Sequence, residues 1–351
     1  MKFLSEEGII EWKNYSAGRN SRLYRMTREY KGATVWRTLS DQNLIRRINY
    51  NAKNLKYMNS KKYPHLNKFV YMIQINAEAA FQTIEETYQY MIKSDIKEVR
   101  AKAESRRSFS IGEVIKIAQK QIYIKVNNTN FRYDTNYTRI PSELVKHLHI
   151  NGNRLIEIDI VNSQPFFSSG LFNPTEEIQR IMGQPLYMFT KNLNISDMQD
   201  IKQYVSLVTN GNFYEFLTQE YAKKGLTYID RRDFKDHLFT VYFGKNNAAR
   251  YSSAVKLFET LFPNVWSLFR FIKRKEHNKL AILLQRMESH TILDRVAPKI
   301  ILEFQDVPFL TKHDSILLPG DTPEEKKEEI EKLIIKVIEE VIGNKPKLKK
   351  K

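Results

Sequence analysis

A chain of 351 residues is long enough to bury a substantial hydrophobic core and to divide into two or three lobes. Its formal net charge of +17 favours a polyanionic partner such as a nucleic acid, although a basic protein whose charge has no specific use fits the same composition. Cysteine is absent, which excludes disulfides and cysteine-based zinc or iron–sulfur sites.

The amino-terminal residues predict neither secretion nor membrane insertion. Glu6 and Glu7 come before a secretory apolar core could form, and no stretch of 18 apolar residues without charge is present. We therefore expect a soluble, cytoplasmic protein with no membrane partner. The compact length is also compatible with a phage or a mobile element in its host cell.

The first third of the chain is predicted to be mainly helical. Residues 1–115 are polar and rich in Lys, Arg, Asn and Tyr, and apolar residues between Tyr63 and Glu98 recur at three- and four-residue spacing. Basic residues cluster at 100–107, which is typical of a solvated helix face, a phosphate-contacting role being the alternative.

Strands are predicted further along the chain. Apolar residues alternate with polar ones from Ile122 to Val126, and a second strand at 155–161 follows a turn at Asn151-Gly152. Residues 175–300 are predicted to be helical again, and two strands around 301–318 form a hairpin with a polar turn.

One more helix is predicted near the end of the chain. It begins in a capping box of Thr322 and Glu325 and ends before Gly343. The lysine-rich segment 345–351 is then expected to be a frayed, solubilising end, contact with a phosphate backbone being the alternative.

Two aspartates, Asp159 and Asp314, occupy settings that suit a metal-binding carboxylate. Asp159 lies near the end of the apolar strand and Asp314 in the polar turn of the hairpin. Strand aspartates are seldom buried without a partner or a metal. Glu157 and Asp159 share one face of the strand, because alternate residues point the same way. Two carboxylates that bridge a metal pair, together with cations for a triphosphate, are what nucleotidyl transfer requires.

A basic and aromatic phrase stands between the two aspartates. Arg231, Lys235, Phe239 and Phe243 are spaced by four residues and therefore share one helical face. Such a face can present two cations to phosphates and two rings to a base. Taken singly, Lys235 would more often be a surface lysine, and the two phenylalanines would more often be core residues.

From residue 127 to 348 the chain resembles, in collinear order, the polymerase superfamily that contains family A DNA polymerases and phage-type single-subunit RNA polymerases. Asp159-x3-Ser163 resembles motif A, the 231–244 phrase ending in Phe243-Gly244 resembles motif B of the fingers helix, and His313-Asp314-Ser315 resembles motif C. The resemblance implies an α+β, right-hand polymerase fold with a small antiparallel palm sheet flanked by helical thumb and fingers lobes. It implies a helical, thumb-like region at 1–120, a palm at 121–174 and 285–351, and fingers at 175–284.

The resemblance also implies roles for individual residues. Asp159 and Asp314, with the main-chain carbonyl of Ile160, would hold two Mg²⁺ ions, Mn²⁺ being an alternative, and Lys235 would be a catalytic proton donor to pyrophosphate. The residues implied to meet the incoming nucleotide are Ser163, Gln164, Arg231, Lys235, Phe239, Tyr242, Phe243 and Gly244. Those implied to hold the nucleic acid are Arg132, Gln285, His290 and His313.

Several positions depart from the DNA polymerase pattern. Gln164 stands where that pattern has a glutamate that blocks the ribose 2′-hydroxyl, and Phe243 replaces the fingers tyrosine, with Tyr242 adjacent. Ser315 and Ser289-His290 look like the RNA polymerase form. These features favour a single-subunit DNA-directed RNA polymerase.

Other functions remain open at this point. A compact family A-like DNA polymerase or a primase-type enzyme is the alternative within the superfamily, and an inactive nucleic-acid-binding protein with a polymerase fold is the alternative from another class. The expected partners are a DNA template or primer–template hybrid and nucleoside triphosphates, an accessory subunit being a further candidate. A metal-dependent nuclease would need a denser cluster of carboxylates than the sequence contains.

Overall fold

The computed structural model describes Glu6, Glu29 and residues 8–13, 23–27, 42–192, 198–225 and 231–351. The chain forms two compact units, Met1–Asn51 and Ala52–Lys351. The first unit contains a hairpin of β1 (Ile10–Lys13) and β2 (Leu23–Met26), and α2 (Gln42–Met58) continues from it into the second unit.

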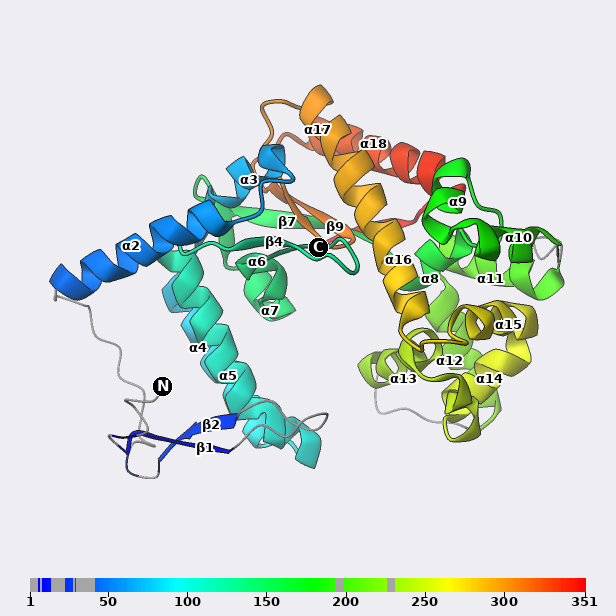
Figure 1. The fold of residues 1–351 in the computed structure, drawn as a ribbon, viewed down its shortest axis with the longest axis horizontal. Helices are drawn as coiled ribbons and strands as arrows, with labels where there is room; N and C mark the ends of the chain where they lie inside the picture. Colours follow the sequence, from blue (N-terminus) through cyan, green and yellow to red (C-terminus); the bar gives the residue numbers. More distant parts are fainter. Residues whose placement is uncertain are drawn as a thin grey trace. The chain divides into compact units, whose positions relative to one another are not determined.

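The second unit begins with helices. They are α3 (Pro64–Val70), α4 (Ala77–Ile92) and α5 (Lys97–Ala118), and α4 and α5 lie side by side (Figure 1). The side chain of Asn76 caps α4 by accepting a hydrogen bond from the main-chain nitrogen of Ala79 at 3.1 Å. For the described residues the prediction of a mainly helical first third is confirmed, but the strands β1, β2 and β3 (Ile73–Ile75) within it were not predicted.

An antiparallel sheet forms the centre of the second unit. Its strands run in the order β3-β6-β7-β9-β8, and β10 pairs with the remaining part of β7. Apart from β3, these strands are β6 (Leu148–Ile150), β7 (Asn153–Ile160), β8 (Leu310–Lys312), β9 (Ser315–Pro319) and β10 (Leu348–Lys350). Together with the helices around it, this sheet gives the unit the α+β class that was expected.

Short turns set the register of the sheet. Asn151 and Gly152 join β6 to β7 with φ values of 53° and 82°, the positive pair that a two-residue hairpin turn requires, and the predicted turn is therefore confirmed. A separate small hairpin consists of β4 (Ile124–Val126) and β5 (Tyr133–Thr135), so the first predicted strand is present but shorter. Two short helices follow it, α6 (Asn136–Arg139) and α7 (Ser142–Val145).

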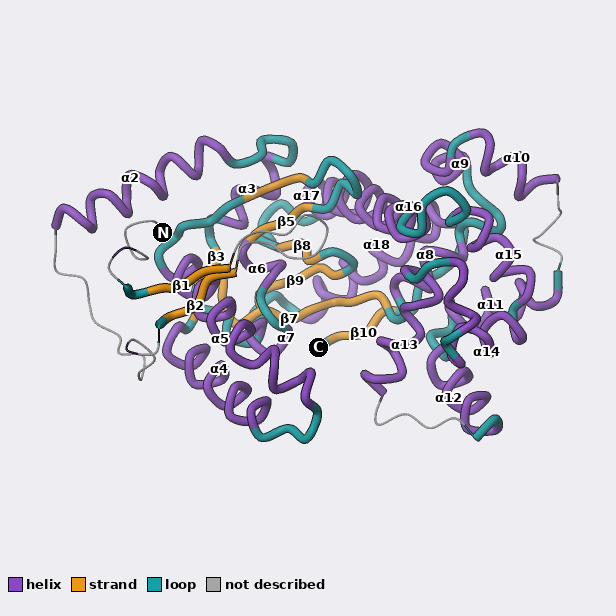
Figure 2. The backbone as a smooth tube through the Cα atoms, turned by 60° about the horizontal axis from the view of Figure 1, so that its bottom comes forward, coloured by secondary structure: helices purple, strands orange, loops and turns teal. Residues whose placement is uncertain are grey.

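A group of helices follows β7, as expected for residues 175–300. It comprises α8 (Ser163–Ser169), α9 (Glu176–Met182), α10 (Gln184–Asn192), α11 (Gln199–Thr209), α12 (Phe213–Lys223), α13 (Arg231–Phe243), the 3₁₀ turn η3 (Asn246–Arg250), α14 (Ser253–Leu261) and α15 (Pro263–Ile272). The helix α16 (Lys279–Ser289) lies between this group and the sheet, and it packs against α8, α9, α13 and α15 (Figures 1 and 2).

The helix α16 continues through a π-helical stretch, η4 (His290–Val296), into α17 (Ala297–Glu303). Since α17 occupies residues up to 303, the predicted hairpin begins later than expected, at Leu310. None of the described helices combines the length and the apolar character that crossing a membrane requires.

Two predictions about the end of the chain were wrong. The helix α18 (Glu324–Ile342) has Pro323 at its N-cap with no side-chain cap, so the expected capping box of Thr322 and Glu325 is not formed. Its predicted end is confirmed, because Gly343 takes φ 81°. The lysine-rich segment is a strand, β10, rather than a frayed end. It pairs with the part of β7 that β6 leaves unpaired. The main-chain groups of β10 and of the end of β7 thereby gain hydrogen-bond partners.

Candidate active site

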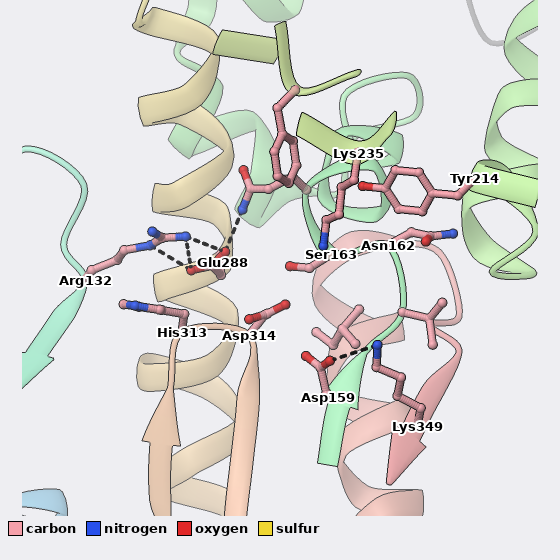
Figure 3. A pocket seen from close by; sticks show the side chains of 14 residues that line it. Arg132, Asp159, Asn162, Ser163, Tyr214, Lys235, Glu288, His313, Asp314 and Lys349 are labelled. Carbon is pink, nitrogen blue, oxygen red and sulfur yellow. Dashed lines mark hydrogen bonds and ion pairs between the residues drawn. The ribbon is translucent and has the colours of Figure 1, made fainter. Parts of the chain in front are cut away.

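A cavity of about 420 Å³ lies where the carboxyl end of β7 and the β8–β9 turn meet α16 and α13 (Figure 3). It is lined by Arg132, Asp159, Ile160, Val161, Asn162, Ser163, Gln164, Tyr214, Lys235, Phe239, Glu288, His313, Asp314 and Lys349. Many of these side chains are charged or polar. The cavity is therefore suited to a charged ligand rather than an apolar one.

Asp159 and Asp314 are brought together by the pairing of β7 with β9. Asp159 lies opposite Ser315 in the register, which places the preceding residue, Asp314, beside it at the end of the sheet. The two side chains face each other across the cavity floor (Figure 3). Burial raises the pKa of Asp314 to about 6, and the negative charge of Asp159 contributes to the rise. A cation between the two carboxylates would relieve this repulsion.

The backbone is strained beside each aspartate. His313, directly before Asp314, has φ 57°, and Asn162, three residues after Asp159, has the same value. Left-handed backbone at a residue other than glycine costs free energy and is concentrated at functional sites. In this cavity the strain accompanies two sharp changes of direction, the turn from β8 into β9 and the entry from β7 into α8.

A buried ion pair forms one wall of the cavity. Glu288 of α16 is 1% exposed and accepts hydrogen bonds from Nε and Nη2 of Arg132, each at 2.9 Å. Its Oε2 also accepts a bond from Nε2 of Gln164 at 2.7 Å. Burial raises the pKa of Glu288 to about 8, although Arg132 opposes the rise. Glu288 thus holds in place two residues that come from different parts of the chain.

Lys235 enters the cavity from α13, opposite the sheet. Its Nζ lies 5.4 Å from the ring centre of Phe239 and 5.8 Å from that of Tyr214. Although its surface is accessible to solvent, the surrounding walls remove enough water to lower the pKa of Lys235, while the negative charge of Asp314 opposes this effect. The lysine is therefore a cation within reach of a ligand that is bound over the aspartates.

Lys349 of β10 and Lys351, which directly follows it, contact Asp159. Nζ of Lys351 lies 2.6 Å from Oδ2 of Asp159, and Nζ of Lys349 lies 3.4 Å from the same oxygen. Burial would lower the pKa of Lys351, but the hydrogen bond and the charge of Asp159, together with the charges of Glu157 and Asp314, outweigh that effect and the pKa is raised.

His313 is a neutral neighbour of the site. Burial lowers its pKa to about 4, and the positive charges of Arg132 and Lys312 contribute to the fall. Its Nδ1 is buried without a hydrogen-bond partner in the described part of the chain. The ring can therefore offer a hydrogen bond to a ligand near Asp314.

The available donors fit a pair of hard divalent cations. Within the described ranges no group of three or more His, Asp or Glu side chains could enclose a metal. Mg²⁺ does not need such a cage, because it keeps several waters and takes one or two carboxylates plus substrate phosphates. Asp159 and Asp314, with the carbonyl of Ile160 at the same cavity, supply that donor set.

Several residues that the resemblance implicated lie away from the cavity. Tyr242 is fully buried, and its hydroxyl lies 2.7 Å from that of Tyr204. Phe243 packs against the hydrophobic core, and the carbonyl of Gly244 accepts a hydrogen bond from Lys273. Phe239 is thus the aromatic residue of α13 that lines the cavity, rather than Tyr242 or Phe243.

Two more expected residues that the structure describes, Gln285 and His290, are not among those that line the cavity. Oε1 of Gln285 accepts a bond from Nδ2 of Asn130 at 2.9 Å, in the β4–β5 loop that also carries Arg132. His290 lies outside the cavity lining, because its ring nitrogens face Glu177 at 2.8 Å and Asp294 at 3.2 Å. The side chain of Arg231, at the start of α13, is outside the described residues.

Five lining residues were not anticipated as site residues, namely Val161, Asn162, Tyr214, Glu288 and Lys349. Glu288 had a usable signal, because it lies three residues after Gln285 and therefore on the same side of α16. Lys349 had none, since only the pairing of β10 with β7 brings it to the cavity.

Comparisons with known proteins add little to this geometry. No protein-family model and no curated protein matches the chain. Among solved structures, it is similar to the POL domain of Pol1 from M. smegmatis in complex with DNA primer-template and dNTP, at a TM-score of 0.39 and 11% identity, with 88% of this chain and 70% of that chain covered. A similarity at this level carries no functional argument, so the cavity itself is the basis for assigning a function.

Proposed function

We propose that the protein is a template-directed nucleic-acid polymerase that joins nucleoside triphosphates by nucleotidyl transfer. One observation carries the proposal: Asp159 and Asp314, from distant parts of the sequence, line one cavity whose opposite wall holds Lys235. Paired carboxylates facing a cation suit the transfer of a negatively charged phosphoryl group.

Divalent cations belong to this proposal as cofactors. Asp159, Asp314 and the carbonyl of Ile160 would hold two Mg²⁺ ions, Mn²⁺ being the alternative. When bound, such ions lower the pKa of an attacking hydroxyl and neutralise charge on the leaving group.

The residues of α13 act on the nucleotide. Lys235 binds the phosphates and stabilises the charge that grows on them during transfer. Burial moves the pKa of Lys235 down towards neutral pH, and this makes its ammonium group a better proton donor to the leaving pyrophosphate. Phe239, which lines the same wall, provides a flat apolar surface for the base. Arg231, four residues before Lys235, is proposed as a second phosphate contact.

Arg132 and His313 hold the nucleic acid near the reacting end. Two nitrogens of the Arg132 guanidinium are bonded to Glu288, and this fixes its plane. Its Nη1 has no hydrogen-bond partner among the described residues and can donate to a nucleotide. Gln285, which is bonded to the loop before Arg132, supports that placement.

Gln164 supports the preference for ribonucleotides. Because its Nε2 donates to Glu288, its Oε1 is left buried and without a partner in the described residues. A free acceptor can take a hydrogen bond from a ribose 2′-hydroxyl, and a smaller deoxyribose would leave it unsatisfied. A single-subunit DNA-directed RNA polymerase is therefore preferred over a compact DNA polymerase or a primase-type enzyme.

The lobes follow from the same proposal. Residues 121–174 and 285–351 form the palm, residues 175–284 the fingers, and residues 1–120 a thumb-like region. A DNA template or a primer–template hybrid is the partner, and an accessory subunit is a further candidate.

Incorporation of labelled nucleotides tests the proposal. Wild-type protein should extend a nucleic acid in Mg²⁺ or Mn²⁺, with ribo- and deoxyribonucleotides supplied separately on single-stranded, primed and duplex templates. Asp159→Asn and Asp314→Asn should each reduce incorporation on the order of 10³-fold or more, because each removes charge that is needed in the transition state. Both variants should still bind nucleic acid.

Asp306→Asn is the matched control, because this carboxylate pairs with Lys326 on the surface, far from the cavity lining. Normal incorporation by either active-site variant would contradict the proposal. If wild-type protein binds nucleic acid but incorporates nothing with either metal, the chain is instead an inactive nucleic-acid-binding protein.

A further inference from the structure

Lys349 and Lys350 of β10 and Lys351, which directly follows it, alternate between two environments. Lys349 and Lys351 point to Asp159, as described above, whereas Nζ of Lys350 lies 3.2 Å from a carboxylate oxygen of each of Glu324 and Glu331 on α18. This alternation is a property of a strand, in which successive side chains point to opposite faces. The segment therefore delivers lysines to the cavity in a fixed register.

Main-chain hydrogen bonds hold this register. Lys349 lies opposite Asp159 in the pairing of β10 with β7. On one side of that pair the main-chain nitrogen of Val161 donates to the carbonyl of Lys347 at 2.9 Å. On the other side Glu157 and Lys351 exchange two bonds, at 2.9 and 3.1 Å. The position of Lys349 is thus built into the sheet and does not depend on its ion pair with Asp159.

The ion pair itself is easily exchanged. The side chain of Lys349 is 49% exposed, and its contact of 3.4 Å is long for an ion pair. Asp159 is largely buried, but the lysine end of the pair is open to solvent and can move away. Lys349 also lines the cavity without filling it, so a ligand can enter while the lysine is present. Figure 3 shows its ammonium group at the edge of the cavity beside Asp159.

A second cation faces Lys349 across the same space. Lys235 reaches the cavity from α13, and the positive charge of Lys349 contributes to lowering the pKa of Lys235, so the two ammonium groups are near enough to repel. Repulsion between two lysines is relieved when a polyanion binds between them. The two lysines come from opposite walls, one from the helix and one from the sheet.

We propose that Lys349 is a phosphate-binding residue that, together with Lys235, holds the triphosphate of the incoming nucleotide. This inference rests on the proposed function and deepens it. In the nucleotide-free protein the ammonium group of Lys349 neutralises Asp159. When a nucleotide and its metal enter, Asp159 turns to the metal and Lys349 turns to the phosphates. Lys351, whose Nζ lies 2.6 Å from Asp159 and 3.9 Å from Glu157, does not line the cavity and keeps its place beside the strand.

Nucleotide binding by three variants tests this. The measurement is the affinity for a fluorescent, non-hydrolysable nucleoside triphosphate, in Mg²⁺ and again in EDTA, with the unphosphorylated nucleoside as a second ligand. Lys349→Gln should weaken triphosphate binding about tenfold or more in both conditions and leave nucleoside binding unchanged. Lys235→Gln should behave in the same way. Lys349→Arg should restore most of the triphosphate affinity.

Lys350→Gln is the control, since it changes a neighbouring lysine of the same strand that faces away from the cavity. If loss of strand β10 were the cause, both Lys349→Gln and Lys350→Gln would lose affinity, and that result would overturn the inference. Equal triphosphate affinity in Lys349→Gln and wild type, with incorporation intact, would also overturn it and leave the proposed function standing.

Two further outcomes are informative. If Lys349→Gln bound triphosphate more tightly or needed less Mg²⁺, Lys349 would be a competitor of the metal rather than a phosphate ligand, which contradicts the inference. If wild-type protein bound triphosphate but incorporated no nucleotide, and Lys349→Gln lost that binding, the inference would be supported while the proposed reaction failed.

Discussion

At the scale of single residues, Asp314 is a buried carboxylate whose charge is unfavourable in the folded protein. Its charge is buried and lies beside that of Asp159, so its ionised form is less stable in the folded protein than in water. A structural carboxylate would instead be paired with a cation. In this site the cations closest to the aspartates contact Asp159, and Asp314 keeps its unfavourable charge.

Removing that charge should stabilise the metal-free protein. The ordinary pKa of Asp314, 3.8, rises to about 6, a difference that corresponds to at most about 3 kcal/mol in the folded state. A raised carboxyl pKa means that the charged form destabilises the fold above about pH 6, and the penalty disappears below the ordinary pKa. Asp314→Asn should therefore raise the free energy of unfolding at about pH 7 and change it little near pH 4.

Urea denaturation in EDTA at the two pH values measures this difference. Asp306→Asn, at an exposed ion pair, serves as the reference and should not stabilise the protein at either pH. An Asp314→Asn variant that is less stable than wild type at neutral pH would show that the carboxylate is a structural group and not a strained one.

Individual residues differ in how visible they are in the sequence. Asp159, Asp314 and Lys235 could be selected because a charged residue in an apolar strand, in a hairpin turn or on a helical face shared with aromatic residues is chemically conspicuous. The meeting of the two aspartates at one cavity needed only the antiparallel pairing of two recognisable strands, whereas Lys235 is brought there by the packing of α13. Tyr242 and Phe243 were equally conspicuous, but Tyr242 is buried and Phe243 packs against the core one turn beyond Phe239. Nothing local to the sequence sets which turn of α13 reaches the cavity.

At the scale of elements, β10 shows why some structure cannot be predicted locally. The sequence Leu348–Lys350 has no alternation of apolar and polar residues, and lysine is somewhat depleted in strands. The strand forms because β6 pairs with the start of β7 only and leaves main-chain groups at Ile158–Ile160 unpaired along that edge. The cause of β10 is therefore an edge almost 200 residues away in the sequence, while β7, β9 and α18 carry their own signals.

Gly211 gives a way to perturb this element from outside the site. It has φ 75°, and a Cβ there would lie 2.7 Å from Cδ of Lys347 and 3.0 Å from Cγ1 of Val161, the two residues that join β10 to β7. Gly211→Ala should destabilise the protein by about 1–3 kcal/mol through backbone strain. It should also speed amide exchange at Val161 and Lys351, because the added carbon displaces the start of the strand.

Gly225 provides the matched control. Its φ is 68°, but no described atom lies within 4 Å of the position of an added Cβ. Gly225→Ala should thus show the cost of the backbone alone, measured by urea denaturation, with exchange at Lys351 unchanged. Equal exchange in the two alanine variants would mean that Gly211 does not position β10.

At the scale of the whole molecule, the net charge of +17 contrasts with the two carboxylates that line the cavity. The α+β class could be predicted because strand and helix periods alternate clearly along the chain. The division into Met1–Asn51 and Ala52–Lys351 could not, since it falls within the helix α2 and has no linker composition to mark it. The charge, in contrast, is a property of the sequence that needs no fold to be interpreted.

A basic protein that binds nucleic acid through phosphates should release counterions when it binds. We expect the logarithm of the affinity for a primer–template to fall linearly with the logarithm of the salt concentration, with a slope of about −0.9 for each phosphate contacted in duplex DNA. Fluorescence anisotropy with a labelled primer–template measures the slope. The same oligonucleotide with methylphosphonate linkages, which carry no charge, is the control and should bind far more weakly.

Variants of the two aspartates provide a comparison for the salt dependence of binding. Asp159→Asn and Asp314→Asn remove negative charge from the cavity without removing any cation, so they should leave the slope unchanged and weaken binding little or not at all in EDTA. Tight binding that is insensitive to salt, or equal binding of the uncharged oligonucleotide, would show that the protein recognises bases or shape instead. The excess of Lys and Arg would then have no part in binding, and the basic composition would no longer support a nucleic-acid partner.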